Sequence, residues 1–165
     1  MLLRRIARPL LASWFVSEGL GAARQPAAHV EDARVALALL TRLAPPSLAA
    51  ATTRYDPPTT RQLTQLVQVH GAATLAAGAL LAFGRAPRTA ALVLAGLSVP
   101  LVVANLPFTG HHDPDKEARR ARRDRLVTTL ALTGGALLAG ADYEGRPGVA
   151  WRVSKARKDH TSDAG

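Results

Sequence analysis

Two ionisable residues stand within long apolar stretches of the sequence, Glu18 near the end of the first stretch and His70 near the start of the second. Placing a charged group in lipid hydrocarbon costs at least about 2.5–3.5 kcal/mol, so such residues are candidates for function. A carboxylate and an imidazole at one site can pass a proton between them, because histidine changes its charge near neutral pH. The two residues therefore predict a binding or proton-transfer site, provided that the fold brings them together.

Four apolar blocks, almost free of charge, are the elements that would position these side chains. They cover residues 6–23, 66–83, 89–108 and 126–141. Each lies near the short end of the ~17–25 residues that a helix needs to cross a ~30 Å hydrocarbon core. A soluble four-helix bundle is the alternative, but no block shows the polar stripe of a helix that faces water. The sequence predicts an all-α fold, an antiparallel bundle of four transmembrane helices.

The connections between the blocks complete a predicted membrane domain of residues 1–152. The first connection contains Val30–Leu43, where apolar residues recur at helical spacing, which predicts a short amphipathic helix along the interface or capping the bundle. Gly84–Arg88 predicts a tight turn, and the basic stretch 111–125 predicts a helix that runs into the fourth block. Residues 153–165 are polar and charged, which predicts a disordered tail.

Small residues and prolines bear on how the helices pack and end. Thr74, Gly78 and Ala82 follow one another at four-residue spacing, which lets helix backbones approach closely in lipid. Pro100 and Pro107 are expected to kink or end the third helix, because each removes a backbone donor.

Antiparallel connection of the spans gathers polar residues at one mouth of the bundle. The end of the first span and the start of the second lie at similar depth, which places Glu18 near His70. The same side receives Asn105, His111, His112, Thr128 and Thr129. Such a cluster predicts a site for a quinone headgroup or a small anion; the alternative is that Glu18 and His70 reach the interface or satisfy each other structurally.

No catalytic or metal-binding motif accompanies this cluster. Imidazoles such as those of His70, His111 and His112 suit zinc, copper or iron. The chain has no His-Glu-x-x-His spacing, phosphate loop or dinucleotide fingerprint, however. The sequence therefore predicts no catalytic residue, no metal and no resident cofactor, with quinone as the one candidate cofactor.

The overall charge and the absence of cysteine narrow the function classes. A chain without cysteine forms no disulfide, thiolate metal site or iron–sulfur centre and has no thiol nucleophile. The net charge of +9 is explained by anchoring to anionic lipid headgroups. Single-stranded nucleic acid is disfavoured as a partner, because aromatic residues that would stack on bases make up only 4% of the chain.

The basic residues also give an expected orientation. Lysine and arginine nearly balance between the two sides of a four-span topology, and the first span usually decides. Arg4, Arg5 and Arg8 precede or open that span, so the termini are expected in the cytoplasm. The start resembles a signal peptide, but Arg8, Pro9 and Glu18 interrupt its apolar run, which predicts a retained helix.

Three stretches of the chain carry a resemblance to a known family. They are Arg8-Pro9-Leu10-Leu11-Ala12 with Phe15 and Gly19; His70-Gly71-Ala72 through Ala77-Gly78 to Gly84-Arg85-Ala86-Pro87-Arg88; and Leu130-Ala131-Leu132-Thr133-Gly134-Gly135 through Tyr143-Glu144-Gly145-Arg146-Pro147 to Ala150-Trp151-Arg152. Together they resemble the DoxX family of small four-helix membrane proteins. The resemblance implies a multi-pass protein of the bacterial inner membrane, associated with thiosulfate:quinone oxidoreduction or with complexes that couple redox enzymes to thiol homeostasis.

The sequence departs from the family pattern at the polar cluster. His70-Gly71-Ala72 stands where many relatives have Asn-Gly-Ala, and Thr128-Thr129 stands where a Lys-Asn pair is expected. Asn105-Leu106-Pro107-Phe108, followed by two histidines, replaces a His-Phe-Trp-like stretch. These differences bear on any ligand that relatives bind there.

Two functions follow as expectations. The first is a DoxX-like membrane subunit or scaffold, without catalysis of its own, that supports redox or thiol-homeostasis enzymes, with lipid and those enzymes as partners. The alternative is a quinone-reactive subunit of a thiosulfate:quinone-type oxidoreductase that uses Glu18 and His70. A solute carrier is disfavoured, because four short spans with few charges leave little room for a pathway.

Overall fold

A computed structural model describes residues 2–45, 58–107 and 115–142. Over these residues the chain is helical and contains no strand. Five α-helices and one short 3-10 helix follow one another: α1 (Leu2–Arg24), η1 (Pro26–His29), α2 (Val30–Leu43), α4 (Thr60–Ala82), α5 (Pro87–Ala104) and α6 (Lys116–Ala141). The predicted all-α class is therefore confirmed for the described part of the chain. The predicted tail, residues 153–165, and the end of the third block, Phe108, lie outside it.

The helix ends follow from local capping chemistry. Thr59 and Gln62 form a reciprocal capping box that starts α4, with the Thr59 backbone N–H donating to the Gln62 side chain at 2.8 Å. The Asp115 side chain accepts from the Ala118 backbone N–H at 2.7 Å and starts α6. Pro87 opens α5, where its missing donor costs nothing. These signals place the starts of α4 and α6 well before the apolar blocks they contain.

The turn between α4 and α5 is tight, as the sequence predicts. Gly84 has a φ of +69°, a conformation that glycine adopts without strain, and Ala86 has a φ of 49°. Beyond the turn, α5 continues through Pro100 and ends at Ala104, so Pro100 does not end the helix and Pro107 lies past it.

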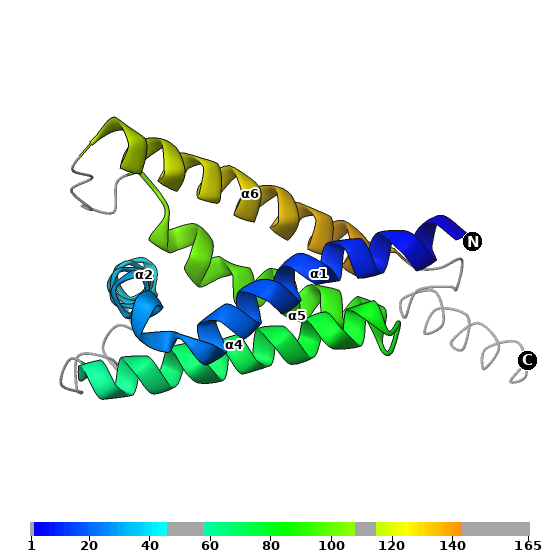
Figure 1. Cartoon of the computed structure of the whole chain (residues 1–165), viewed down its shortest axis with the longest axis horizontal. Helices are drawn as coiled ribbons and strands as arrows, with labels where there is room; N and C mark the ends of the chain where they lie inside the picture. Colours follow the sequence, from blue (N-terminus) through cyan, green and yellow to red (C-terminus); the bar gives the residue numbers. More distant parts are fainter. Residues whose placement is uncertain (1, 46–57, 108–114, 143–165) are drawn as a thin grey trace, which may run out of the picture.

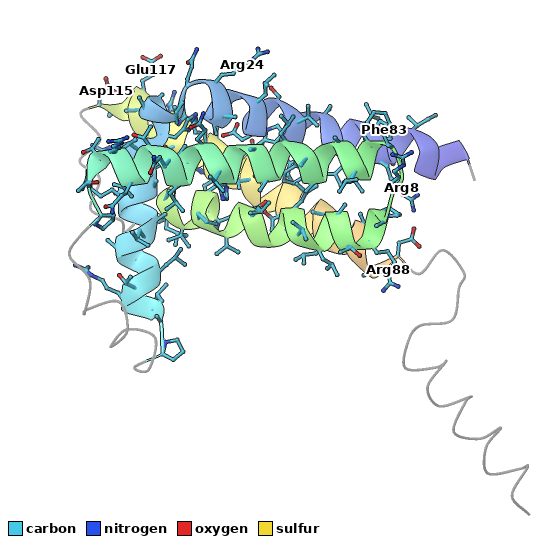
Figure 2. The ribbon with its side chains drawn as sticks, turned by 90° about the horizontal axis from the view of Figure 1, so that it is seen from below. Arg8, Arg24, Phe83, Arg88, Asp115 and Glu117 are labelled. Carbon is cyan, nitrogen blue, oxygen red and sulfur yellow. The ribbon has the colours of Figure 1, made fainter. Side chains whose placement is uncertain are left out.

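The four long helices run side by side, and α2 crosses them at one end (Figures 1 and 2). The most extensive packing is between α1 and α4, followed by α5 with α6 and α4 with α5. Helix α2 packs across α5 and α4. Figure 1 shows α6 near α1 at the right of the view and far from it at the left, and their mutual contact is slight. The bundle is therefore splayed between α1 and α6 at the end where α2 lies.

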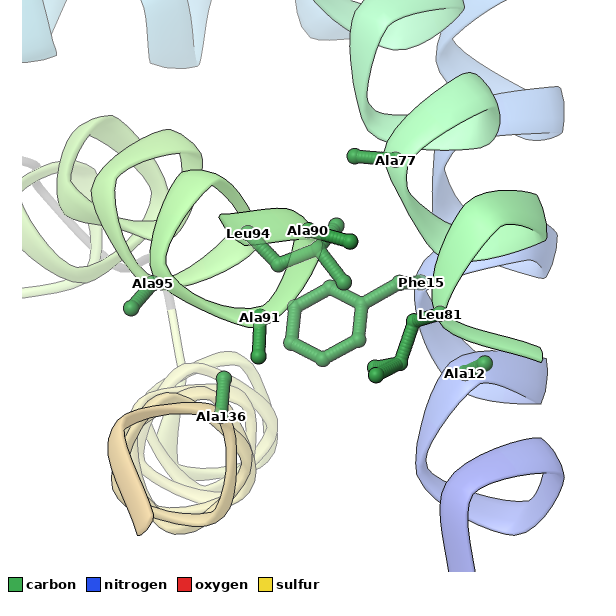
Figure 3. Packing of buried hydrophobic residues seen from close by; sticks show 9 residues of the cluster. All are labelled: Ala12, Phe15, Ala77, Leu81, Ala90, Ala91, Leu94, Ala95 and Ala136. Atoms are coloured by element: carbon green, nitrogen blue, oxygen red, sulfur yellow. The ribbon is translucent and has the colours of Figure 1, made fainter. Parts of the chain in front are cut away.

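The core is built mainly from alanine. Figure 3 shows Phe15 of α1 reaching between the helices toward small residues of α5 and α6. The cluster contains Ala12, Phe15, Ala77, Leu81, Ala90, Ala91, Leu94, Ala95 and Ala136. Small side chains in the interior let the helix axes come close together.

Many large apolar side chains lie on the outside of the bundle. Leucine, isoleucine, valine and phenylalanine residues are exposed on every long helix: Ile6, Leu10, Leu66, Val69, Leu80, Phe83, Leu92, Val93, Val99, Val127, Leu130, Leu137 and Leu138. Phe83 and Leu138 keep 81% and 75% of their surface exposed. Phe15, Leu63, Leu81 and Leu94 are fully buried, so the outer surface holds many of the large apolar residues but not all of them.

Two of the described helices, α4 and α5, are long and apolar enough to cross a membrane. Helices α1 and α6, which contain the other two predicted spans, do not meet the same test of length and hydropathy. Helix α1 carries Arg8 and Glu18 within its apolar stretch, and α6 begins with a charged segment from Lys116 to Arg125, which lowers the hydropathy of both. By length and composition, two of the four predicted spans, those in α4 and α5, are therefore candidates for crossing a membrane.

Candidate ligand cavity at the α2 end of the bundle

A cavity of about 590 Å³ lies at the splayed end of the bundle. Its walls come from α1, α2, α4, α5 and α6, together with His29 of η1. Sites for small molecules usually have volumes of ~300–1,000 Å³ and are mostly apolar, with a few placed polar groups. Apolar residues, chiefly leucine and alanine, form most of this wall, so the cavity has the size and lining of such a site.

The cavity brings together the described members of the predicted polar cluster. Glu18, His70, Asn105, Thr128 and Thr129 all line it. His111 and His112 lie outside the described residues. Glu18 and His70 both line this cavity. Among the described residues, no hydrogen bond joins the two side chains. Both side chains are half-buried and directed at the same space, which leaves them available to a ligand.

Close packing of two glycines sets Glu18 and His70 opposite each other. Gly19 and Gly71, their sequence neighbours, are both buried in the contact between α1 and α4. A Cβ atom on Gly19 would lie 2.5 Å from the Leu75 backbone nitrogen and 2.7 Å from the Gly71 carbonyl oxygen. Because the two backbones touch here, the adjacent side chains emerge at the same level of the bundle.

Hydroxyl and amide groups on the cavity wall donate to their own helices. Thr74 Oγ1 donates to the His70 carbonyl at 2.9 Å, and Ser98 Oγ to the Leu94 carbonyl at 2.8 Å. Thr129 Oγ1 and Asn105 Nδ2 likewise donate to the carbonyls four residues before them, both at 2.8 Å. A hydroxyl whose proton is used in this way presents only acceptor lone pairs. Thr74, Ser98 and Thr129 therefore offer oxygens, not protons, to the cavity.

Further polar residues line the cavity that the sequence reasoning did not include. They are His29 and Asp32 at the start of α2, and Asp124 and Arg125 of α6. Helical spacing could have found two of them, because Asp124 and Arg125 stand one turn before Thr128 and Thr129. Asp32 lines the cavity because α2 lies across the end of the bundle. The sequence left open whether this helix lies along the interface or caps the bundle, so it did not place Asp32 at the site.

An aromatic pair closes the wall on α1. Trp14 and Phe15 meet edge to face, with ring centroids 5.1 Å apart and an interplanar angle of 86°. Phe15 is buried in the core, whereas Trp14 lines the cavity one helical turn before Glu18. Edge-to-face contacts are a preferred aromatic geometry, so the buried ring holds the indole in place.

A metal ion has no evident set of ligands here. Among residues 2–45, 58–107 and 115–142, no group of three or more histidine, aspartate or glutamate side chains is placed to hold one.

Comparison with known proteins gives no relative. No protein-family model, no curated protein and no solved structure matches this chain.

Proposed function

We propose that the chain is a four-helix integral membrane protein in which α1, α4, α5 and α6 span the bilayer and α2 lies along the interface. The supporting observation is the number of large apolar residues exposed on all four long helices, around a core that is mainly alanine with a few large residues such as Phe15. Removing a leucine, valine or phenylalanine side chain from water is worth ~1.5–3 kcal/mol. A soluble monomer would forgo that gain on all four long helices and expose an unusually large apolar surface.

Lipid explains the marginal spans as well as the exposed residues. Helix α1 keeps its charged groups near the ends of its apolar stretch: Arg8 lies at the start and Glu18 faces the cavity. Polar residues that face a cavity in the bundle avoid contact with hydrocarbon. The basic first turns of α6, with Arg119, Arg120 and Arg123 exposed, extend beyond its apolar part. In this proposal they lie in the headgroup region or beyond it.

The orientation follows from the arginines at the amino terminus, which favour cytoplasmic termini in a bacterial inner membrane. The cavity and α2 then face the opposite side.

Cysteine labelling is expected to reveal this sidedness, because the chain has no cysteine of its own. In intact cells, a membrane-impermeant maleimide should label Arg119→Cys at the start of α6 and should label Arg85→Cys in the α4–α5 turn only after permeabilisation. Each variant removes one positive charge, from opposite ends of the bundle, so the charge balance changes equally. Labelling of Arg85→Cys alone would reverse the orientation, and labelling of both in intact cells would contradict four spans.

Within that architecture, the function proposed is a DoxX-like subunit that supports membrane-bound redox or thiol-homeostasis enzymes. The support is the resemblance of three stretches, with Arg8–Ala12 in α1 and His70–Gly78 in α4 contributing to the packed α1–α4 pair. The exposed basic turns of α6 offer a surface that an acidic region of a partner enzyme can bind.

Co-purification in mild detergent from the native membrane tests the scaffold function. We expect a redox enzyme to be enriched and identified by mass spectrometry. Combined Arg119→Ala and Arg123→Ala changes should reduce its recovery several-fold at low salt, whereas Arg85→Ala at the other end should not. Failure of any redox enzyme to co-purify with a folded, membrane-inserted protein would contradict this function and leave the bundle intact.

The quinone-reactive alternative remains a second prediction. The cavity shared by Glu18 and His70 favours it, since its apolar wall suits the body of a lipid-soluble molecule. A quinone headgroup carries carbonyl acceptors, however, and needs donors from the protein. The hydroxyls of Thr74, Ser98 and Thr129 already donate to their own helices, which leaves N–H groups such as those of His70 and Arg125 as donors and makes this alternative less favoured.

A further inference from the structure

We propose that the cavity is a binding site for an amphipathic organic cation, that is, a protonated amine or quaternary onium group carried on an apolar body. This inference goes beyond the proposed scaffold role and does not depend on any partner enzyme. It rests on the charge of the cavity wall, its hydrogen-bonding groups, its aromatic residue and its route of access.

The formal charge of the wall is negative. Glu18, Asp32 and Asp124 contribute three carboxylates, and Arg125 is the single arginine, with no lysine, among the lining residues. Within the described ranges, no hydrogen bond or ion pair joins the side chains of these three acids to another residue. The chain as a whole has a net charge of +9, so this cavity wall, with its unpaired acids, is opposite in sign to the protein as a whole. Opposite charge in a partly desolvated cavity attracts a cation more strongly than it would in water.

The hydrogen-bonding groups favour the same class of ligand. Thr74, Ser98 and Thr129 are almost fully buried, and each uses its proton on a backbone carbonyl. Their remaining lone pairs are acceptors, like the carboxylates. A ligand that fills this space gains most if it brings N–H donors or a positive charge. At these three hydroxyls, a ligand that brings carbonyl or carboxylate oxygens would place acceptor against acceptor, although Arg125 and the histidines of the wall carry N–H donors.

Trp14 adds an aromatic surface to the cavity on the same helix as Glu18. It precedes Glu18 by one helical turn on α1, so that both side chains line the cavity from one face of the helix. Indole is the best aromatic partner for a cation, because its ring face is negative. The contact of Trp14 with buried Phe15 keeps this surface in a fixed place.

The rest of the wall and the splayed helices account for the apolar part of the ligand. Leu37 and Leu40 of α2, Leu66 of α4, and Leu97 and Leu101 of α5 line the cavity. Residues of α1 and α6 line it as well, although these two helices diverge at this end of the bundle (Figure 1). In the proposed membrane arrangement, this end of the bundle lies at the interface, so an amphipathic cation partitioned into the membrane can reach the cavity with its charge at that depth.

Equilibrium dialysis of the purified full-length protein in a non-ionic detergent tests the proposal. Tetraphenylphosphonium is the cationic probe, tetraphenylborate the anion of matched shape, and decylubiquinone the quinone probe, with protein-free micelles as background. We expect saturable binding of tetraphenylphosphonium at one site per chain, with tetraphenylborate bound at least ten-fold more weakly. Glu18→Gln should weaken phosphonium binding about ten-fold. The control Glu31→Gln should leave it unchanged, because the Glu31 side chain is 71% exposed and pairs with Arg34 away from the lining residues.

A second variant keeps the test decisive if Glu18→Gln fails to fold, as judged by circular dichroism and gel filtration. Asp124→Asn alters an exposed residue of α6 and should still weaken binding about three-fold. Full affinity in folded Glu18→Gln, or in Asp124→Asn where that variant replaces it, would overturn the inference. Equal binding of tetraphenylborate, tighter retention of decylubiquinone, or no saturable phosphonium binding to the folded chain would each overturn it as well. None of these results bears on the scaffold function, which co-purification tests separately.

Discussion

Gly19→Leu is expected to separate α1 from α4 and to destabilise the bundle by about 3 kcal/mol or more. The first atom of the new side chain already meets backbone atoms of α4, the Leu75 nitrogen at 2.5 Å and the Gly71 oxygen at 2.7 Å. Backbone atoms of a packed helix cannot rotate away as a side-chain end can, so the helices must move apart. The thermal unfolding midpoint in detergent, followed by circular dichroism, should fall by about 10 °C.

Gly21→Leu is the matched control, two residues further along the same helix. A Cβ on Gly21 meets nothing within 4 Å, and the residue is exposed. Leucine is a better helix former than glycine by up to ~1 kcal/mol, and it inserts into lipid more readily. The control should therefore keep or raise the thermal unfolding midpoint. The lower midpoint expected for Gly19→Leu then cannot come from poorer insertion of α1 into lipid. Equal midpoints for the two variants would contradict the close α1–α4 contact.

The helices themselves were largely predictable, because apolar periodicity and capping residues are local signals. The amphipathic segment Val30–Leu43 is a helix with those same bounds. The basic stretch before the fourth block is helical from Lys116, as predicted, but the start of α4 was less accurate, because an apolar block marks where hydropathy rises and not where a helix begins. Thr59 and Asp115 start these helices in polar sequence, and only their capping hydrogen bonds identify them.

The candidate site was predictable in part for a reason of topology. Antiparallel spans carry Glu18 and His70 to one end of the bundle whatever the details of packing, and the structure places both on one cavity wall. The contact of Gly19 with Gly71 was not foreseen, because glycine spacing does not say which helix a given face meets. Thr74 and Gly78 were expected in helix packing by their spacing, and both are buried in α4. The position of α2 across the cavity depends on tertiary packing, so no local pattern could place Asp32 in the wall.

The acceptor character of the cavity also escapes sequence reasoning, because a threonine can donate or accept. The structure settles which it does, since Thr129 Oγ1 donates to the Arg125 carbonyl. A polar cluster that suggested quinone or anion chemistry in the sequence thus becomes, with hydrogen bonds assigned, better suited to a cation. The residue types alone predicted where the candidate site lies but not which class of ligand it prefers.

Val93→Arg is expected to abolish stable membrane insertion of the bundle. Val93 lies near the middle of α5, is 46% exposed and, in the proposed arrangement, faces hydrocarbon. Arginine at the centre of a span costs ~2.5–3.5 kcal/mol on insertion scales, a large share of the stability of a bundle with marginal spans. The protein should be lost from the alkali-resistant membrane fraction, as measured by immunoblot after carbonate extraction. Thr89→Arg is the control, because Thr89 is exposed in the first turn of α5 beside Arg88 and should insert normally.

The same substitution distinguishes lipid from water as the solvent of the outer surface. In a soluble bundle, arginine at an exposed valine would meet water at almost no cost, and surface changes of that kind stay within about 0.5 kcal/mol. Such a variant would remain folded and become more soluble without detergent. Val93→Arg protein recovered in the supernatant, folded and at the level of Thr89→Arg, would therefore contradict the membrane arrangement of α5 and with it the four-span proposal.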